Sequence, residues 1–207
     1  MEKETLEGFL AALASEAPAP GGGAAAAVQV ALGASLVSMV CNLTIGKPRY
    51  AEHEQTMIAA RAEADRIRRQ ALELAEADAR AFTAVTDAYK LPKQTDEEKA
   101  ARSRAIQQAL VGAADVPLRT AAAAAEVVEL CRRILPGANV NVLSDVAVAA
   151  ASARAALDSA AINVWVNLAS MTDAATREAT ASRLEAHLAA VEGADEVVRT
   201  VGERIRS

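Results

Sequence analysis

The apolar and polar positions along the chain divide it into segments of helix length. No charged residue occurs within 24–45, and the uncharged stretch around it is the longest in the sequence. A helix that is apolar on every side is buried by neighbouring helices or lies in a membrane. Frequent alanine and polar residues such as Gln29 and Asn42 favour the central helix of a soluble bundle over a membrane span. Gly46 and Pro48 predict where this helix stops.

Amphipathic patterns predict five further helices. They span about 5–15, 52–89, 95–134, 141–169 and 173–204. Thr95 and Glu98 have the spacing of a capping box, and Pro117 is expected to kink its helix because it lacks a backbone donor. No segment alternates with a period of two residues, so the sequence predicts an all-α protein. We expect one domain, residues 1–207, built as a bundle of long helices.

Charge and cysteine content limit the classes of function. The formal net charge is -5 over 207 residues, which gives no indication of a nucleic-acid partner. Cys41 and Cys131 fit no metal-ligand spacing and lie in apolar helical surroundings, so we expect buried, reduced thiols. The first ten residues are charged and amphipathic, unlike a secretory signal, which favours the cytoplasm.

Three glycines, Gly21, Gly22 and Gly23, stand directly before the uncharged helix. We expect a turn with positive φ there, since glycine adopts that conformation without strain. The first backbone N–H groups of a helix have no partner within it, so this turn could hold a phosphate or a carboxylate. The alternative is a plain helix start.

Asp78 interrupts an apolar stripe on the helix predicted over 52–89. The stripe consists of Ile67, Ala71, Leu74, Asp78, Phe82, Val85 and Tyr89. A carboxylate on a buried face is strongly destabilising unless it is paired. Asp78 therefore pairs with a cation, lines a wet pocket, or faces solvent on a helix whose phase differs from the predicted one.

A polar line begins at Asp145 and runs along the helix predicted over 141–169. Asn163 follows eighteen residues later, which is five whole turns, so the two side chains share a face. They lie about 27 Å apart along the axis and cannot both contact one reacting atom. Asn163 could instead hydrogen-bond a neighbouring helix, and Asp145 could simply favour the start of its own helix.

Lys47 is the first cation after the uncharged helix, and Arg49 and Tyr50 follow it. The helix dipole favours a cation at this end, but a partly desolvated lysine could also transfer a proton or hold an anionic ligand. Lys93 could attract an acidic ligand or be solvated. His53 and His187 have no companion at ligand spacing, so no metal site is predicted.

Five blocks of sequence resemble a known family. They read PAPGGGAAA, MVCNLTIGKPRY, DARAFTAVTDAYKLPKQTDEEKAAR, ADVPL, and NVNVLSDVAVAA followed by NVWVN. In this order they resemble the cyclodeaminase/cyclohydrolase family, which includes the C-terminal domain of formiminotransferase-cyclodeaminase. The stand-alone bacterial methenyltetrahydrofolate cyclohydrolases are the most similar members. Pro48 departs from the pattern, because relatives often carry a second basic residue there, and this weakens any role for a basic doublet.

The resemblance implies an up-and-down helical bundle that forms homodimers, with a folate site in a cleft near the dimer interface. The implied reaction is reversible hydrolysis of 5,10-methenyltetrahydrofolate to 10-formyltetrahydrofolate, with no metal or redox cofactor and no nucleic-acid or membrane partner. The chemistry needs a base, an acid and negative charge near the methenyl cation. For the catalytic roles we expect Asp78, Lys47 and Asp145. For substrate binding we expect Gly21, Gly22, Gly23, Asn42, Arg49, Tyr50, Lys93, Asn141 and Asn163.

Two other functions remain open at this point. A formimidoyltetrahydrofolate cyclodeaminase uses a similar intermediate but releases ammonia. A non-catalytic helical interaction protein would carry the same carboxylates and asparagines for structural reasons only, and would bind no folate.

Overall fold

The structure is a computed structural model that describes residues 5–207. Within that range the chain forms helices joined by short loops and no strand, which confirms the predicted all-α class. The elements are α1 (Leu6–Leu13), α2 (Gly22–Asn42), η1 (Pro48–His53), α3 (Glu54–Lys90), α4 (Asp96–Ile134), η2 (Val140–Val142), α5 (Leu143–Ala169), α6 (Ala174–Leu188) and α7 (Ala190–Arg206).

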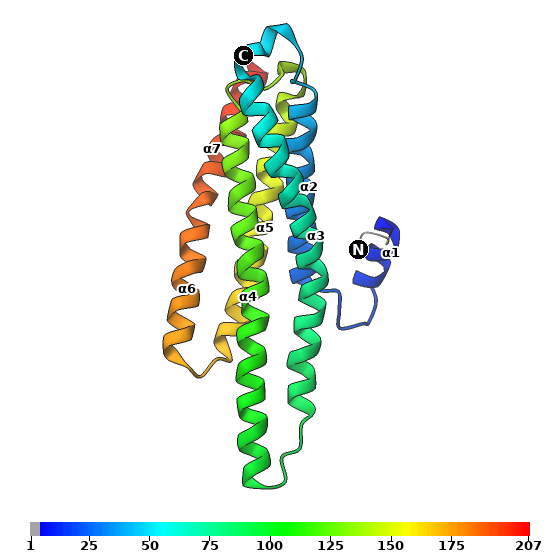
Figure 1. Cartoon of the computed structure of the whole chain (residues 1–207), viewed down its shortest axis with the longest axis vertical. Helices are drawn as coiled ribbons and strands as arrows, with labels where there is room; N and C mark the ends of the chain where they lie inside the picture. The colour runs from blue at the N-terminus through cyan, green and yellow to red at the C-terminus, as the bar shows by residue number, and fades with distance from the viewer. Residues whose placement is uncertain (1–4) are drawn as a thin grey trace.

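The long helices run side by side and alternate in direction along the chain (Figure 1). α2 packs against α3 and α5, while α4 packs between α3 and α5. Most buried positions of α2 are alanine or valine, such as Ala27, Val30 and Ala34, which are fully buried. Small side chains let the helix axes approach closely over long contact lengths, as the alanine-rich composition indicates.

α3 and α4 are longer than their partners. They contain 37 and 39 residues, against 21 in α2 and 27 in α5. Their ends near the α3–α4 loop therefore project beyond the start of α2 and the end of α5 (Figure 1). The predicted apolar stripe is buried at Ile67 and Leu74, but Phe82 is 42% and Tyr89 48% exposed. The expectation of a fully buried stripe is wrong there because, among the described helices, neither α2 nor α5 extends along this part of α3 (Figure 1).

The C-terminal helix is divided where one continuous helix over 173–204 was expected. The interruption is one residue, Ala189, whose backbone stays right-handed helical with φ −56° and ψ −22°. α7 therefore follows α6 without a loop and buries Ala194, Val197 and Val201 against the bundle. No proline or glycine stands at this point, so the sequence carries no local signal for the division.

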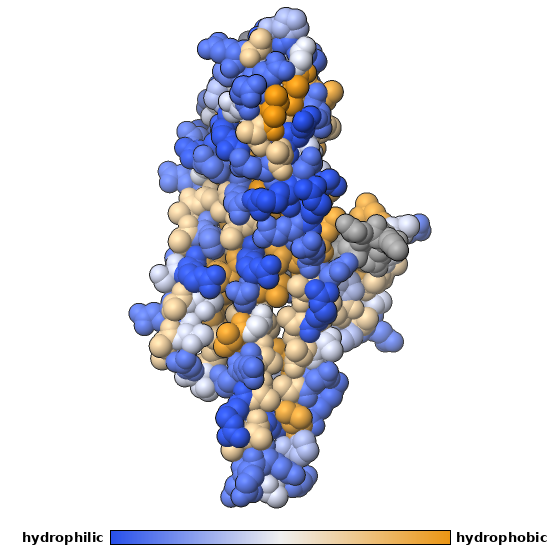
Figure 2. Space-filling view, viewed as in Figure 1, coloured by the Kyte–Doolittle hydropathy of each residue, from blue (hydrophilic) through white to orange (hydrophobic). Residues whose placement is uncertain are grey.

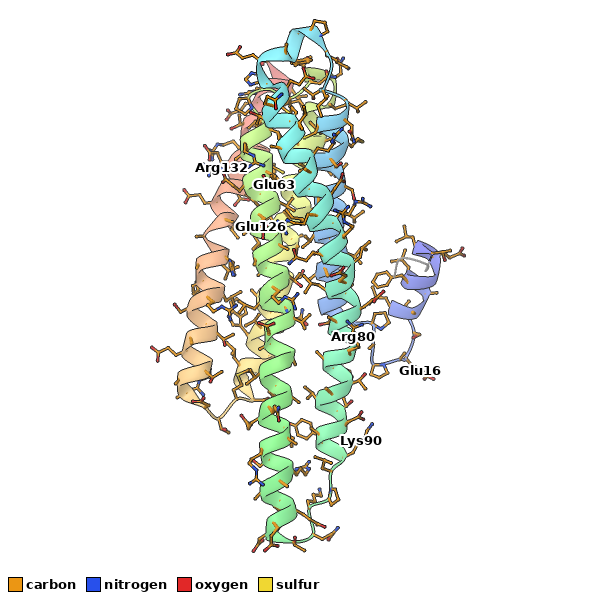
Figure 3. The ribbon with its side chains drawn as sticks, in the orientation of Figure 1. Glu16, Glu63, Arg80, Lys90, Glu126 and Arg132 are labelled. Carbon is orange, nitrogen blue, oxygen red and sulfur yellow. The ribbon has the colours of Figure 1, made fainter. Side chains whose placement is uncertain are left out.

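Ion pairs join α3 to α4 in the upper half of the bundle. Glu63 pairs with Arg133 at 2.9 Å, and Glu126 pairs with Arg66; Figure 3 labels the two glutamates. Figure 2 shows hydrophilic side chains spread over this face, with small groups of hydrophobic ones between them. The predicted capping box of Thr95 and Glu98 is present at the start of α4.

By length and composition alone, α2 and the segment Val140–Ala169 could each cross a membrane. For α2, 61% of the most apolar 18-residue window is buried within the fold, and for the second segment 39%. The core position of α2 explains its apolar composition without a membrane. The lower value for the second segment means that part of its apolar surface remains uncovered.

Candidate active site

A cavity of about 400 Å³ opens where α2 begins and α5 ends, against the walls of α3 and α4. We call it the Asp78 pocket. It is lined by Pro18, Ala19, Gly21, Gly22, Gly23, Asp78, Ala81, Phe82, Val85, Tyr89, Leu110, Ala113, Asn163, Val166, Asn167 and Ser170. Among these residues Asp78 alone carries a charge, and most of the others are apolar. The pocket therefore combines one carboxylate with a largely apolar wall, as small-molecule sites commonly do.

Asp78 caps α2 from a different helix. Its Oδ2 accepts a hydrogen bond of 3.1 Å from the backbone N–H of Ala24, in the first turn of α2. Burial raises the pKa of the Asp78 carboxyl, and the bond from Ala24 offsets part of that rise. A carboxylate with a raised pKa in a pocket is a candidate general base, because it accepts a proton more readily than an ordinary aspartate.

Gly23 makes room for that carboxylate. A Cβ atom at residue 23 would lie 2.0 Å from Asp78 Oδ1, so only glycine fits without moving the side chain. The predicted positive φ at residues 21–23 is wrong: Gly21 is extended with φ −131°, and Gly22 and Gly23 already belong to α2. Among the described residues, positive φ occurs at Gly46 alone, with φ 76°.

Asn163 and Asn167 bring two amide groups from α5 to the pocket. Asn163 Nδ2 donates to Ser159 O at 2.8 Å, and Asn167 Nδ2 donates to Asn163 O at 2.9 Å. Asn167 Nδ2 also donates to Ala113 O at 3.2 Å. That carbonyl lies four residues before Pro117, which has no N–H to donate, so Asn167 supplies the hydrogen bond that the proline removes from α4.

Other predicted site residues lie at the opposite end of α2. Lys47, Arg49 and Asn141 are exposed there. Tyr50 OH donates to Asn139 Oδ1 at 3.3 Å and accepts from the N–H of Val140 at 3.1 Å, so it ties η1 to the loop before α5. The 21 residues of α2 separate this end from the Asp78 pocket by about 30 Å. One chain therefore does not bring Lys47 to Asp78.

Three more predicted residues lie outside the pocket. Asp145 is half-buried at the start of α5, and the unbroken helix keeps it far from Asn163, as its spacing predicts. Asn42 is exposed, and its Oδ1 accepts from Arg61 Nη1 at 3.1 Å. Lys93 is exposed in the α3–α4 loop, close in sequence to Lys90, which Figure 3 places near the far end of α3.

Asn167, Phe82 and Tyr89 line the pocket but are not among the binding residues expected from the sequence. Two features of the sequence indicate Asn167. It lies one turn after Asn163, and Pro117 lacks the N–H that would bond the carbonyl of Ala113. The apolar stripe of α3 predicts a core position for Phe82 and Tyr89, but α3 extends beyond α2 and α5.

The cysteines and the acidic residues give no sign of a metal centre. Cys41 and Cys131 are buried free thiols, and burial raises their pKa values to about 11 and about 12. Over residues 5–207, no three His, Cys, Asp or Glu side chains gather as they would around a metal ion. The buried, reduced state expected for both thiols matches their positions.

Comparison with known proteins identifies relatives over nearly the whole chain. Methenyltetrahydrofolate cyclohydrolase of Methylorubrum extorquens is 50% identical over 186 residues, which cover 90% of this chain and 89% of that protein. Formimidoyltransferase-cyclodeaminase of Mus musculus is 36% identical over 184 residues. Those residues are 89% of this chain but 34% of the mouse protein, so the chain spans about a third of that relative.

A solved structure shows the same fold. The crystal structure of formiminotetrahydrofolate cyclodeaminase from Thermotoga maritima matches with a TM-score of 0.89 and 29% sequence identity, covering 100% of this chain and 99% of that one. A family model described as formiminotransferase-cyclodeaminase matches residues 5–186. The chain therefore belongs to the formiminotransferase-cyclodeaminase family.

Proposed function

We propose that this chain catalyses the reversible hydrolysis of 5,10-methenyltetrahydrofolate to 10-formyltetrahydrofolate, in the cytoplasm. Half of its residues are identical to those of the cyclohydrolase from Methylorubrum extorquens over 90% of its length. The structural observation that carries the proposal is the Asp78 carboxylate, which Ala24 N–H holds in a pocket where it is the one charged side chain among the described lining residues. A single negative charge in an apolar site matches the delocalised positive charge of the methenyl group.

The reaction assigns Asp78 two roles. Its charge stabilises the methenyl cation, and its free oxygen Oδ1 takes a proton from the water that attacks the methenyl carbon. The bond from this carbon to one folate nitrogen then breaks, that nitrogen gains a proton, and the formyl group stays on the other. One proton is released overall. Because the methenyl carbon is already electrophilic, we expect the reaction to need no metal and no redox cofactor.

We further propose that the working form is a homodimer. α2 and α5 leave large apolar side chains exposed, namely Leu32, Met39, Leu43, Val148, Ile162 and Val166. On each helix these residues follow one another at helical spacing, so they form a stripe. We name this surface the α2–α5 face. A second copy packed on it would cover the stripe, and an antiparallel copy could bring its Lys47 and Asp145 toward the Asp78 pocket.

The primary test is the loss of methenyltetrahydrofolate absorbance in the near ultraviolet, at mildly acidic pH where spontaneous hydrolysis is slow. The purified protein should accelerate this loss. Asp78→Asn should lower kcat by about 10²- to 10⁴-fold, the usual range for a general base. Asp87→Asn is the matched control, because Asp87 is on the same helix but exposed and paired with Lys90. A fully active Asp78→Asn protein would exclude the assignment of Asp78.

The alternative activity is deamination of formiminotetrahydrofolate, since the solved structure of the Thermotoga protein carries that name. It is tested on the same preparation by supplying formiminotetrahydrofolate and measuring released ammonia. Ammonia release without methenyl hydrolysis would replace the cyclohydrolase proposal. Inactivity on both substrates, without any folate binding, would support a non-catalytic helical protein.

A further inference from the structure

The Asp78 pocket has more hydrogen-bond acceptors than donors among its side chains. Both Nδ2 groups of Asn163 and Asn167 are committed to backbone carbonyls of α4 and α5. Turning either amide around would set its oxygen against a carbonyl oxygen, so the orientation of both amides is fixed. Their Oδ1 atoms accept no hydrogen bond from any described residue. Asn167 uses both of its N–H donors and therefore offers only an acceptor to a ligand, whereas Asn163 offers an acceptor and its second N–H.

A third acceptor stands beside these two. Asp78 uses Oδ2 to cap α2, while its Oδ1 accepts no hydrogen bond within residues 5–207. Asn163 lies close to the same helix start, because a Cβ at Gly22 would be 3.5 Å from its Nδ2. Asn167 follows one turn further, about 6 Å along α5. Three acceptor oxygens thus lie in one pocket, and none of its lining side chains is Lys, Arg or His.

The remaining walls suit a flat ring. Phe82 and Tyr89 are exposed by 42% and 48%, and both line the pocket from α3. Arg102 lies 5.5 Å from the Tyr89 ring centre and donates to its backbone carbonyl, which holds this part of α3 against α4. Aromatic faces bind planar rings by stacking. The ligand that matches the pocket is therefore planar, uncharged or cationic, and rich in N–H groups along one edge.

We propose that the pterin ring of the substrate enters the Asp78 pocket with its amino-bearing edge toward α5, and that Asn167 is the specificity-determining residue that accepts its N–H. This rests on the proposed function for the substrate class. The glutamate tail carries carboxylates, and a pocket of acceptors around Asp78 excludes it. The tail therefore extends out of the pocket.

The test compares two ligands on two proteins. Tetrahydrofolate presents the 2-amino group, and its 2-desamino-2-methyl analogue lacks these N–H donors. Native protein should bind tetrahydrofolate about tenfold or more tightly, since the analogue leaves a pocket acceptor unpaired. Asn167→Ser should bind both ligands within about twofold of each other. Serine can bond the carbonyl four residues before it, as Ser35 does with Ala31 O at 2.7 Å, but it offers no amide oxygen.

Gln107→Ala is the control for a merely structural effect. Gln107 holds the end of α5 by bonding Ser170 O at 3.1 Å and Thr172 N–H at 2.8 Å, and it does not line the pocket. This variant should lose stability but keep the preference for tetrahydrofolate. If Asn167→Ser fails to fold, Asn167→Ala is measured in its place.

The outcomes separate the two proposals. Native protein that turns over methenyltetrahydrofolate but does not distinguish the two ligands would overturn the pterin orientation alone. An Asn167 variant that still binds tetrahydrofolate more tightly than the analogue, as the native protein should, would also overturn the pterin orientation. Native protein that binds neither ligand and turns over no folate would overturn both.

Discussion

Asp78 serves the fold and the proposed chemistry with one carboxylate. One oxygen caps α2 through Ala24, and the other faces a pocket in which no second charged residue is found among the described lining residues. Burial raises the pKa of this carboxyl, so the native state binds a proton more readily than the unfolded chain does. An ionised, half-buried carboxylate therefore reduces the stability of the fold at neutral pH, which is a common property of functional groups.

Asp78→Asn should remove the loss of stability that the ionised carboxylate causes at neutral pH. Because the native pKa is raised above the ordinary value of 3.8, native stability falls as pH rises from about 4 through the raised pKa. Asparagine can still accept from Ala24 N–H and carries no charge. In urea unfolding, the variant should be more stable relative to native protein at pH 7 than at pH 4. An equal difference at both pH values would contradict the raised pKa.

Gly23→Ala tests the space reserved for the carboxylate. The new Cβ would displace Asp78 from its position 2.0 Å away and break its bond to Ala24. Alanine favours the helix by about 1 kcal/mol, while the lost hydrogen bond costs about 1–3 kcal/mol, so the free energy of unfolding should fall by up to about 2 kcal/mol. Turnover should fall by at least about tenfold, since the base is moved. Gly112→Ala is the control: its Cβ meets nothing within 4 Å, Gly112 does not line the pocket, and turnover should be unchanged.

At the scale of elements, the pocket exists because helices of unequal length are packed together. α3 is 16 residues longer than α2 (37 against 21), or about 24 Å, and its additional turns form a wall beside the start of α2. The same difference explains the exposed Phe82 and Tyr89. Apolar spacing could predict which face of α3 is buried, but it could not predict where the neighbouring helices end.

Helix ends are predicted accurately where a cap marks them. Thr95 and Glu98 begin α4 as their spacing predicts, whereas α2 ends at Asn42, four residues before the Gly46 expected to stop it. Ala189 shows the opposite case. It divides α6 from α7 inside an alanine-containing segment that favours a continuous helix. Such a division depends on what the two halves pack against, and the local sequence does not contain that information.

Thr95→Ala should lower the free energy of unfolding by about 1 kcal/mol, because it removes the acceptor for Glu98 N–H at the start of α4. The α3–α4 loop lies at the far end of the projecting helices, so turnover should not change. Chemical denaturation and the absorbance assay measure the two quantities. Ser103→Ala, at an exposed position later in α4, is the control and should be neutral. A loss of activity in Thr95→Ala would indicate that the loop contributes to the site.

At the scale of the whole molecule, the expected site residues fall into two groups. Gly21, Gly22, Gly23, Asp78 and Asn163 meet in the pocket, while Lys47 and Asn141 lie at the other end of the bundle. Resemblance to a family can identify all of these residues, because each of them is present in the sequence of every subunit. It cannot say which chain supplies each one, and the length of α2 separates the two groups within one chain.

Ile162→Glu and Leu32→Glu should convert a dimer into a monomer, because each sets a charge on the α2–α5 face. Sedimentation velocity measures the change. Ile205→Glu is the control, since Ile205 is similarly exposed at 60% but lies on α7. Native protein that sediments as a monomer at all concentrations would overturn the proposed dimer.

A mixing experiment then tests whether the two groups of residues act together across that dimer. Asp78→Asn and Lys47→Ala would each be inactive alone. If Lys47 acts on the partner's pocket, an equal mixture of the two re-assembled together should regain about a quarter of native turnover, because half of the dimers contain one intact site. If Lys47 acts within its own chain, the mixture stays inactive.

The hydrogen bond from Ala24 N–H to Asp78 makes the start of α2 sensitive to the protonation state of Asp78. When the carboxylate takes up a proton, a charge-assisted bond becomes a neutral one of roughly half the strength. The first turn of α2 is then held less firmly for as long as the proton stays. The deuterium uptake of the Ala24 amide should therefore increase when Asp78 is protonated. It would report proton transfer to Asp78 although the amide itself takes no part in the reaction.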